Sequence, residues 1–161
     1  MSLSGFTLPP MENEPVLGYL PGSPERKSLQ DELKRQSQEV VEIPCIINGE
    51  EVWTENIVEQ VMPYKHAHVI ARVHLAGEME IRNAIEASLH AHQSWSSLPW
   101  QERAAVFIKA ADLLAGERRA EVNASTMLNQ SKTCHQAEID SACELIDFWR
   151  LNAHFAQQIC Q

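Results

Sequence analysis

One long helix constrains the fold of this chain more than any other feature of its sequence. The helix is predicted within residues 126–156, where Thr133 and Gln136 form a capping box, Thr-x-x-Gln, at its start. Beyond the box, apolar residues recur at steps of three and four, which is the period of one helical face. The face expected to be apolar consists of Ile139, Ala142, Cys143, Ile146, Trp149 and Ala153.

Acidic residues occupy another side of the same helix. They are Asp140, Glu144 and Asp147, and Arg150 follows Asp147 at a helical spacing. The pattern alone favours a solvated face in which Asp147 and Arg150 form an ion pair. A helical acid can instead bind a cationic ligand, and the spacing does not distinguish Glu144 from its neighbours.

The N-terminal part of the sequence predicts an arm followed by a helix. Residues 1–22 hold four prolines and three glycines, which favours an extended or flexible tail without a core of its own. Ser23 followed by Pro24 is typical of a helix start. A mostly polar helix is therefore predicted over residues 24–40.

Short strands are predicted next. Asn48-Gly49 stands between two short runs, residues 43–47 and 50–54, and this arrangement predicts a β-hairpin. Two more strands are expected at residues 58–62 and 69–75, with residues 63–68 as the turn between them.

Three further helices precede the long one. They are predicted at residues 78–95, from Pro99 to about residue 115, and at residues 117–128, with residues 129–132 as a loop. Gly116 is expected to end the second of them in the left-handed conformation. The apolar faces of the first two are predicted to hold Ile81, Ile85, Leu89 and His92, and Ala104, Phe107, Ala111 and Leu114. The sequence thus predicts a mainly α-helical chain with short β-strands and one hairpin.

Candidate metal and redox sites are weak. His66 and His68 would share a face of a strand, but the turn expected there argues against a strand, and His90 and His92 would diverge on a helix. The start of a helix can lower the pKa of Cys134, although its neighbour His135 would point elsewhere. Exposed or hydrogen-bonded histidines are favoured, and no metal ligand is assigned.

Charge and composition exclude several classes of partner. The net charge of −9 argues against nucleic acid and anionic membranes, and no apolar run has the length of a membrane span. The first residues lack the pattern of a secretory signal or a mitochondrial presequence. The six glycines are too scattered for a dinucleotide or phosphate fingerprint, so no cofactor-binding residue is assigned.

Four stretches resemble a known enzyme family. They are NEPVLGYLPGSPER, IPCIINGEEVWT, ERAAVFIKAADLLAGERRAE and AEIDSACELIDFWRLNA. In this order they are similar to the Δ1-pyrroline-5-carboxylate dehydrogenases, also called L-glutamate γ-semialdehyde dehydrogenases, of the aldehyde dehydrogenase superfamily. The resemblance implies the N-terminal part of that α/β fold. Residues 23–161 would then be an incomplete part of its cofactor-binding domain.

The resemblance also implies a function and a site. The family oxidises L-glutamate γ-semialdehyde to L-glutamate in proline catabolism, with NAD as cofactor, and the acid matching Glu144 contacts the α-ammonium group of the substrate. The nucleophilic cysteine and the other catalytic residues of the family lie beyond the matched region, so no catalytic residue is expected in this chain. A homo-oligomer and the mitochondrial matrix are implied for the full-length enzyme, with the cytoplasm as the alternative location because no presequence is visible.

Two expectations concern the chain by itself. It should be inactive as a dehydrogenase, and it should expose a large apolar surface that favours association. The alternative function is a non-catalytic helical interaction or regulatory module derived from the enzyme. One departure from the superfamily is Ser131, which stands where glycine is common and would strain a loop of positive φ.

Overall fold

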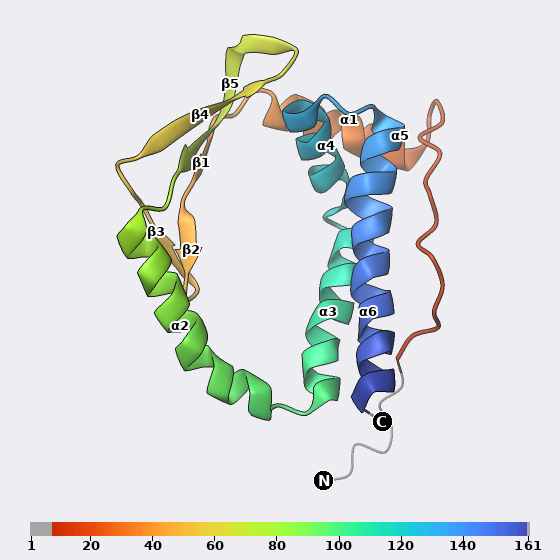
Figure 1. Cartoon of the computed structure of the whole chain (residues 1–161). Helices are drawn as coiled ribbons and strands as arrows, with labels where there is room; N and C mark the ends of the chain where they lie inside the picture. The colour runs from red at the N-terminus through yellow and green to blue at the C-terminus, as the bar shows by residue number, and fades with distance from the viewer. Residues whose placement is uncertain (1–7, 161) are drawn as a thin grey trace.

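The computed structural model describes residues 8–160, which form an arch made mainly of helices, and the two limbs of the arch also meet at the bottom, where α2 leads into α3 (Figure 1). One limb contains the neighbouring helices α3 (Trp100–Ala115) and α6 (Glu144–Cys160). The other limb contains the strands and α2 (Glu78–Ser97). Helices α1 (Pro24–Gln36) and α4 (Arg119–Gln130) pack on each other at the top of the arch.

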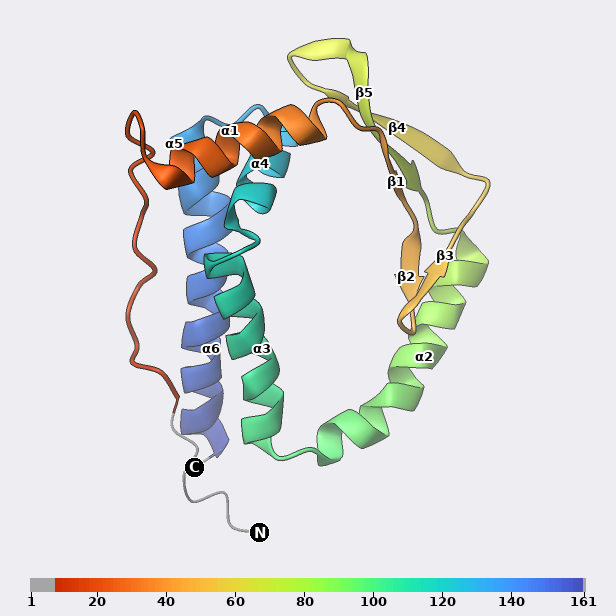
Figure 2. The ribbon, with the colours of Figure 1, turned by 180° about the vertical axis from the view of Figure 1, so that it is seen from behind.

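An extended segment, residues 8–22, runs beside α6 and leads into α1 (Figure 2). We call it the N-terminal arm. Its first described residue, Leu8, is buried against Ala104 and Ala153, so the arm covers part of the contact between α3 and α6. Helix α1 starts as predicted, with Ser23 as its cap, but it ends at Gln36 rather than near residue 40.

The predicted hairpin is confirmed. Strands β2 (Cys45–Ile47) and β3 (Glu50–Val52) pair antiparallel, and Asn48 and Gly49 between them have φ values of 55° and 81°. Two successive residues with positive φ are what a tight two-residue turn requires, and Asn-Gly supplies them with little strain.

A second sheet has the order β1-β5-β4. Strand β1 (Val41–Ile43) lies parallel to β5 (Lys65–His74), and β4 (Ile57–Met62) lies antiparallel to it. The prediction of a turn through residue 68 is wrong, because β5 already begins at Lys65. Lys65 and His66 at its start are exposed, so they give no apolar signal of a strand.

Helices α2 and α3 form where they are predicted, but their surroundings differ. No residue of α2 is buried, whereas α3 buries Ala104, Ala111 and Leu114. Phe107, expected on the same apolar face, is 44% exposed. The left-handed stop at Gly116 is also wrong: its φ is −101°, and its N–H donates to Asp112 O at 3.1 Å to close the last turn.

The long helix is confirmed but is not uniform. Its capping box is formed, with Gln136 N donating to Thr133 Oγ1 and Thr133 N donating to Gln136 Oε1. A short α5 (Cys134–Ala137) continues into the π-helix η1 (Glu138–Cys143) and then into α6. The apolar face packs on α3, and the core there consists of Ala111, Leu114, Ala142 and Ile146.

The loop before α5 is shorter than predicted. Asn129 and Gln130 belong to α4, and Ser131 ends that helix with φ 56° and ψ 26°. A serine in this left-handed region costs about 1–2 kcal/mol, so the departure from glycine does strain the loop. None of the helices within residues 8–160 is long and apolar enough to cross a membrane.

Candidate functional site

Glu144 is the first residue of α6, and its side chain is exposed. Among residues 8–160, its carboxylate has neither a hydrogen-bond donor nor an ion-pair partner. An unpaired acid held at a fixed position on a rigid helix is able to bind a cation.

The two neighbouring acids have partners. Asp140 forms an ion pair with Lys132 Nζ at 2.7 Å. Asp147 accepts hydrogen bonds of 2.7 Å each from the Glu14 N–H and from Asn13 Nδ2 of the N-terminal arm. The predicted pairing of Asp147 with Arg150 is therefore wrong. The three acids, which the sequence could not separate, differ in the structure.

Aromatic residues continue the face that Glu144 begins. Phe148 and Phe155 follow Glu144 by four and eleven residues, which places all three on one stripe of α6. Phe148 is 59% exposed and Phe155 is 47% exposed. Two exposed phenylalanines on one stripe make this side of α6 suited to a ligand or to further polypeptide.

The π-helix sets the direction in which Glu144 points. At its end the Glu144 N–H bonds to Ile139 O, five residues back, instead of four as in an α-helix. One inserted residue rotates everything that follows by about 100° relative to an uninterrupted helix. The sequence period did not reveal this insertion, because the apolar positions tolerate it.

A buried ion cluster stands at the start of the π-helix. Glu138 is completely buried, and its carboxylate forms an ion pair with the buried guanidinium of Arg119. It also accepts hydrogen bonds from the Leu17 N–H at 2.7 Å, from the Tyr19 hydroxyl at 2.7 Å and from Asn123 Nδ2 at 2.9 Å. All of its strong partners come from α4 and the N-terminal arm.

These contacts control ionisation. Burial alone would raise the pKa of Glu138, but the hydrogen bonds from Arg119, Leu17 and Tyr19 hold the pKa below its usual range. Burial and the Glu138 carboxylate together raise the pKa of the Tyr19 hydroxyl. Glu138 is thus a carboxylate and Tyr19 a neutral phenol at neutral pH.

Glu14 extends the cluster along the arm. Its two carboxylate oxygens bind Arg119 Nη1 at 2.5 Å and Arg150 Nη1 at 2.6 Å. Arg150 also reaches Asp112 of α3 at 3.1 Å. We call Glu14, Arg119, Glu138 and Arg150 the clamp, because these residues fix the arm to three helices.

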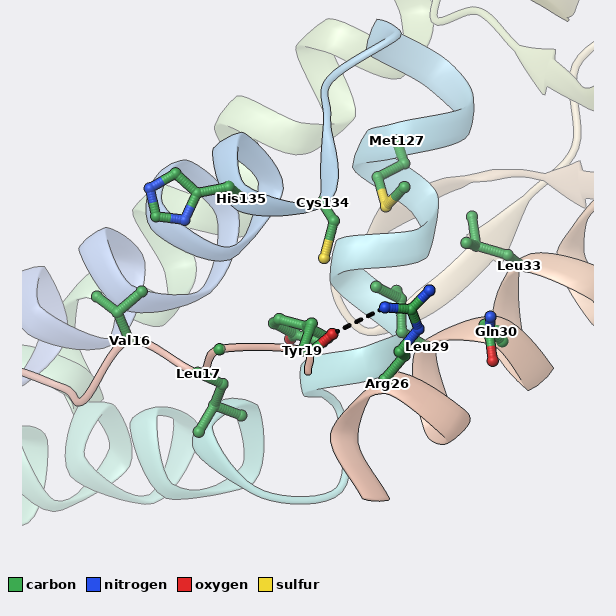
Figure 3. A pocket seen from close by; sticks show the side chains of 11 residues that line it. Val16, Leu17, Tyr19, Arg26, Leu29, Gln30, Leu33, Met127, Cys134 and His135 are labelled. Carbon is green, nitrogen blue, oxygen red and sulfur yellow. Dashed lines mark hydrogen bonds between the residues drawn. The ribbon is translucent and has the colours of Figure 1, made fainter. Parts of the chain in front are cut away.

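A pocket of about 690 Å³ lies beside Tyr19 of the arm (Figure 3). The arm, α1, α4 and α5 line it, and Arg26 Nη1 donates to Tyr19 O across it at 3.3 Å. The side chains of Cys134 and His135 point in different directions, so they form no thiol–imidazole pair. The walls of this pocket are mostly apolar, as the side chains of Val16, Leu17, Leu29, Leu33 and Met127 show.

The comparison with protein families decides the identity. The model of the family described as "Aldehyde dehydrogenase family" matches residues 50–161. The chain belongs to the aldehyde dehydrogenase family. Its mainly helical structure with short strands corresponds to a portion of that fold, as the resemblance implied.

The individual relatives to which the chain is similar share one enzyme name within this family. The mitochondrial Δ1-pyrroline-5-carboxylate dehydrogenase of Mus musculus is 50% identical over 147 residues, which are 91% of this chain and 26% of the relative. The enzyme of the same name from Agaricus bisporus is 46% identical over 158 residues, 98% of this chain and 29% of its own length.

A solved structure matches equally well. The Δ-pyrroline-5-carboxylate dehydrogenase from Mycobacterium tuberculosis, bound with NAD and cobalamin, superposes with a TM-score of 0.93 at 44% identity. The match covers 96% of this chain and 29% of that one. This aldehyde dehydrogenase chain therefore spans between a quarter and a third of the length of the relatives it matches.

Two cysteines of this aldehyde dehydrogenase chain, Cys134 and Cys143, are protonated at neutral pH. Burial, with the charge of Glu138, raises the pKa of Cys134, so the expected lowering by the helix start is wrong. The same two causes raise the pKa of the Cys143 thiol to about 11. Cys143 lies on the apolar face as predicted, with its sulfur 3.4 Å from Arg119 Nη2.

The two histidine pairs lie in different surroundings. His66 and His68 do lie in strand β5, contrary to the expected turn, but His68 Nε2 is hydrogen-bonded to Ser37 O at 2.8 Å. His90 and His92 are exposed on α2. Within residues 8–160, no group of three histidine, cysteine or acidic residues is arranged to hold a metal ion.

Sequence reasoning missed the clamp. Arg119 and Glu138 looked like ordinary charged residues near helix starts, and neither was singled out. A weak signal was present, because Glu138 precedes Ala142 by four residues and so shares the apolar face of the long helix. An acid on such a face needs a buried partner.

Proposed function

We propose that this chain is the N-terminal part of an NAD-dependent dehydrogenase that oxidises L-glutamate γ-semialdehyde to L-glutamate in proline catabolism. The identity of 46–50% to enzymes of that activity over nearly the whole chain supports the substrate class. The substrate is a small zwitterion in this proposal, so the enzyme needs an anionic group for its α-ammonium.

Glu144 is the residue that we assign to that ammonium. The observation that carries the assignment is its unpaired, exposed carboxylate between two acids that are already engaged. Phe148, one turn further along the same stripe, would border the aliphatic part of the substrate. The clamp and the π-helix would fix the direction of the Glu144 side chain.

The remaining chemistry belongs to polypeptide beyond this chain. NAD⁺ would be the hydride acceptor, and none of residues 8–160 forms a glycine-rich loop to which we could assign its phosphates. The cysteine nucleophile would also come from elsewhere, as the resemblance to the family implies, and the raised pKa values of Cys134 and Cys143 agree with this. A homo-oligomer in the mitochondrial matrix completes the proposal for the full-length enzyme, and the cytoplasm is the alternative location.

The first test is Glu144→Ala in the full-length enzyme. A charge-assisted contact to a partly desolvated cation is worth roughly 10- to 150-fold in affinity. Because the ammonium is remote from the aldehyde, the loss should appear mainly as a higher KM for glutamate semialdehyde, with a smaller change in kcat. Steady-state rates of NADH formation measure both parameters.

Two controls make this test specific. A simple aldehyde without an amino group should lose little, and Asp140→Ala should leave KM for the semialdehyde nearly unchanged. If the simple aldehyde suffers equally, or if Asp140→Ala has the same effect, Glu144 does not bind the ammonium and the assignment fails.

A second candidate function is a non-catalytic helical module derived from the enzyme. The raised pKa values of Cys134 and Cys143 favour it for the isolated chain, because a thiol of raised pKa is a poor nucleophile at neutral pH. We expect no NADH formation when the purified chain is mixed with semialdehyde and NAD⁺. Turnover that stays with the chain through purification and is lost on Cys134→Ser would contradict this expectation.

A further inference from the structure

A second pocket, of about 370 Å³, lies where the start of α3 meets the end of α6. Trp95, Trp100, Trp149 and Phe107 form much of its wall. We call it the tryptophan pocket. Its lining on α6 runs from Trp149 to Cys160, so it begins five residues, or about 7.5 Å along the helix axis, beyond Glu144.

One charged residue, Arg103, lines this pocket, and it lacks a counter-charge. Its Nε is buried without a hydrogen-bond acceptor, and none of the ion pairs of residues 8–160 includes its guanidinium. No acidic residue contributes to the lining, although the chain has 22 of them. A buried donor of a charged group without an acceptor is costly, so the pocket favours a ligand that brings an acceptor oxygen.

The aromatic walls of the tryptophan pocket indicate the chemistry of the rest of the ligand. Indole and phenyl rings bind flat apolar groups by stacking and edge contacts, and a cavity of this volume lies in the range of small-molecule sites. A guanidinium prefers a carboxylate, which accepts two parallel hydrogen bonds. The required charge is opposite to that of the ammonium assigned to Glu144, so the two sites select different groups.

We propose that the tryptophan pocket binds a small aromatic carboxylate, with its ring against the indoles of Trp95 and Trp149 and the carboxylate on Arg103. The proposal does not depend on the dehydrogenase activity. It commits to a small molecule, whereas a second copy of the chain inserting a side chain here is an outcome that the experiment must separate.

The experiment titrates the 161-residue chain with 3-phenylpropanoate and, in parallel, with 3-phenylpropanol, its uncharged counterpart. Tryptophan fluorescence reports binding directly, because three of the four tryptophans of the chain line the pocket. We expect saturable binding of the acid with a Kd roughly tenfold or more below that of the alcohol, as a charge-assisted contact implies. Equal Kd values for acid and alcohol in the unaltered chain would overturn the proposal without any variant.

Variants locate the carboxylate. Arg103→Gln should weaken acid binding roughly tenfold or more and leave alcohol binding unchanged, which also shows that the aromatic walls are intact. Arg82→Gln, an exposed arginine of α2 that pairs with Glu78, is the matched control and should change neither Kd. The same loss in both variants indicates general charge attraction and refutes the site.

The assembly state is followed by light scattering during the titration. A fluorescence response that tracks dissociation of oligomers and disappears in the dilute monomer would mean that a second copy fills the pocket, which also overturns the proposal. A response that persists in the monomer supports a small-molecule site.

Discussion

The two limbs of the arch differ in which side chains they bury: one buries charged residues, and the other exposes apolar residues. Around the clamp, charged residues are buried: Glu138 is 0% exposed and Arg119 is 5% exposed. On α2, apolar residues are exposed: Leu89 is 71% and Ile85 is 56% exposed. The first region satisfies its buried charges with partners from this chain, whereas the second buries none of its residues.

This difference separates the interactions that are satisfied within this chain from the surface that is left exposed. The surroundings of Glu138 are complete within this chain, since each of its strong partners lies in the arm or in α4. The apolar face of α2 stays exposed in this chain, and the relatives have more than three times its length. Association of the isolated chain through such exposed apolar surface stays a prediction.

The largest test of this comparison removes the central acid of the clamp. Glu138→Ala leaves Arg119 buried with only part of its counter-charge, and breaking a buried pair in this way costs about 3–5 kcal/mol. We expect a loss of that order in the free energy of unfolding, measured by urea denaturation followed by circular dichroism. Glu86→Ala, an exposed acid of α2, is the control and should stay within about 0.5 kcal/mol.

Equal losses in the two variants would break the comparison. They would mean either that α2 is held by its charges as firmly as the clamp, or that the clamp contributes little to stability in solution.

Low pH should weaken the clamp selectively. The folded-state pKa of Glu138 is lowered from a reference of 4.5, so its contribution to stability is fully present above that pH and is lost as the pH falls through the folded value. The difference in unfolding free energy between the unaltered chain and Glu138→Gln should therefore shrink below about pH 4.5. Urea unfolding over a series of pH values measures it.

The matched variant is Glu86→Gln, for which the difference should be small and independent of pH. A Glu138→Gln difference that is constant from neutral to acidic pH would indicate that the Glu138 ionisation is not coupled to folding.

Features set by neighbouring residues could be predicted from the sequence. The cap at Ser23, the capping box at Thr133 and the turn at Asn48-Gly49 each depend on groups within a few residues, and all three are present. The apolar face of the long helix follows from its period and is also confirmed.

Features set by distant residues could not be predicted. The Leu17 N–H that Glu138 accepts from is 121 residues away, and the Glu14 N–H bound by Asp147 is 133 residues away. No periodicity shows which distant partner an acid will meet, so the clamp and the role of Asp147 were missed. In the same way, an apolar stripe predicts that a helix face can be covered, but it does not show what covers that face. The exposure of Phe107 and Leu89 could therefore not be predicted from the stripe.

The smallest test compares the same substitution in both limbs. Ile146 is completely buried in the core between α3 and α6, whereas Ile85 is more than half exposed on α2. Ile146→Val should cost about 0.5–1.5 kcal/mol, because one methylene group is lost from close packing. Ile85→Val should change the unfolding free energy by less than about 0.5 kcal/mol. If Ile85→Val costs as much as Ile146→Val, α2 is packed against another surface in solution. Because that surface must then come from a second molecule, the cost should fall as the protein is diluted, whereas the cost of Ile146→Val should not depend on concentration.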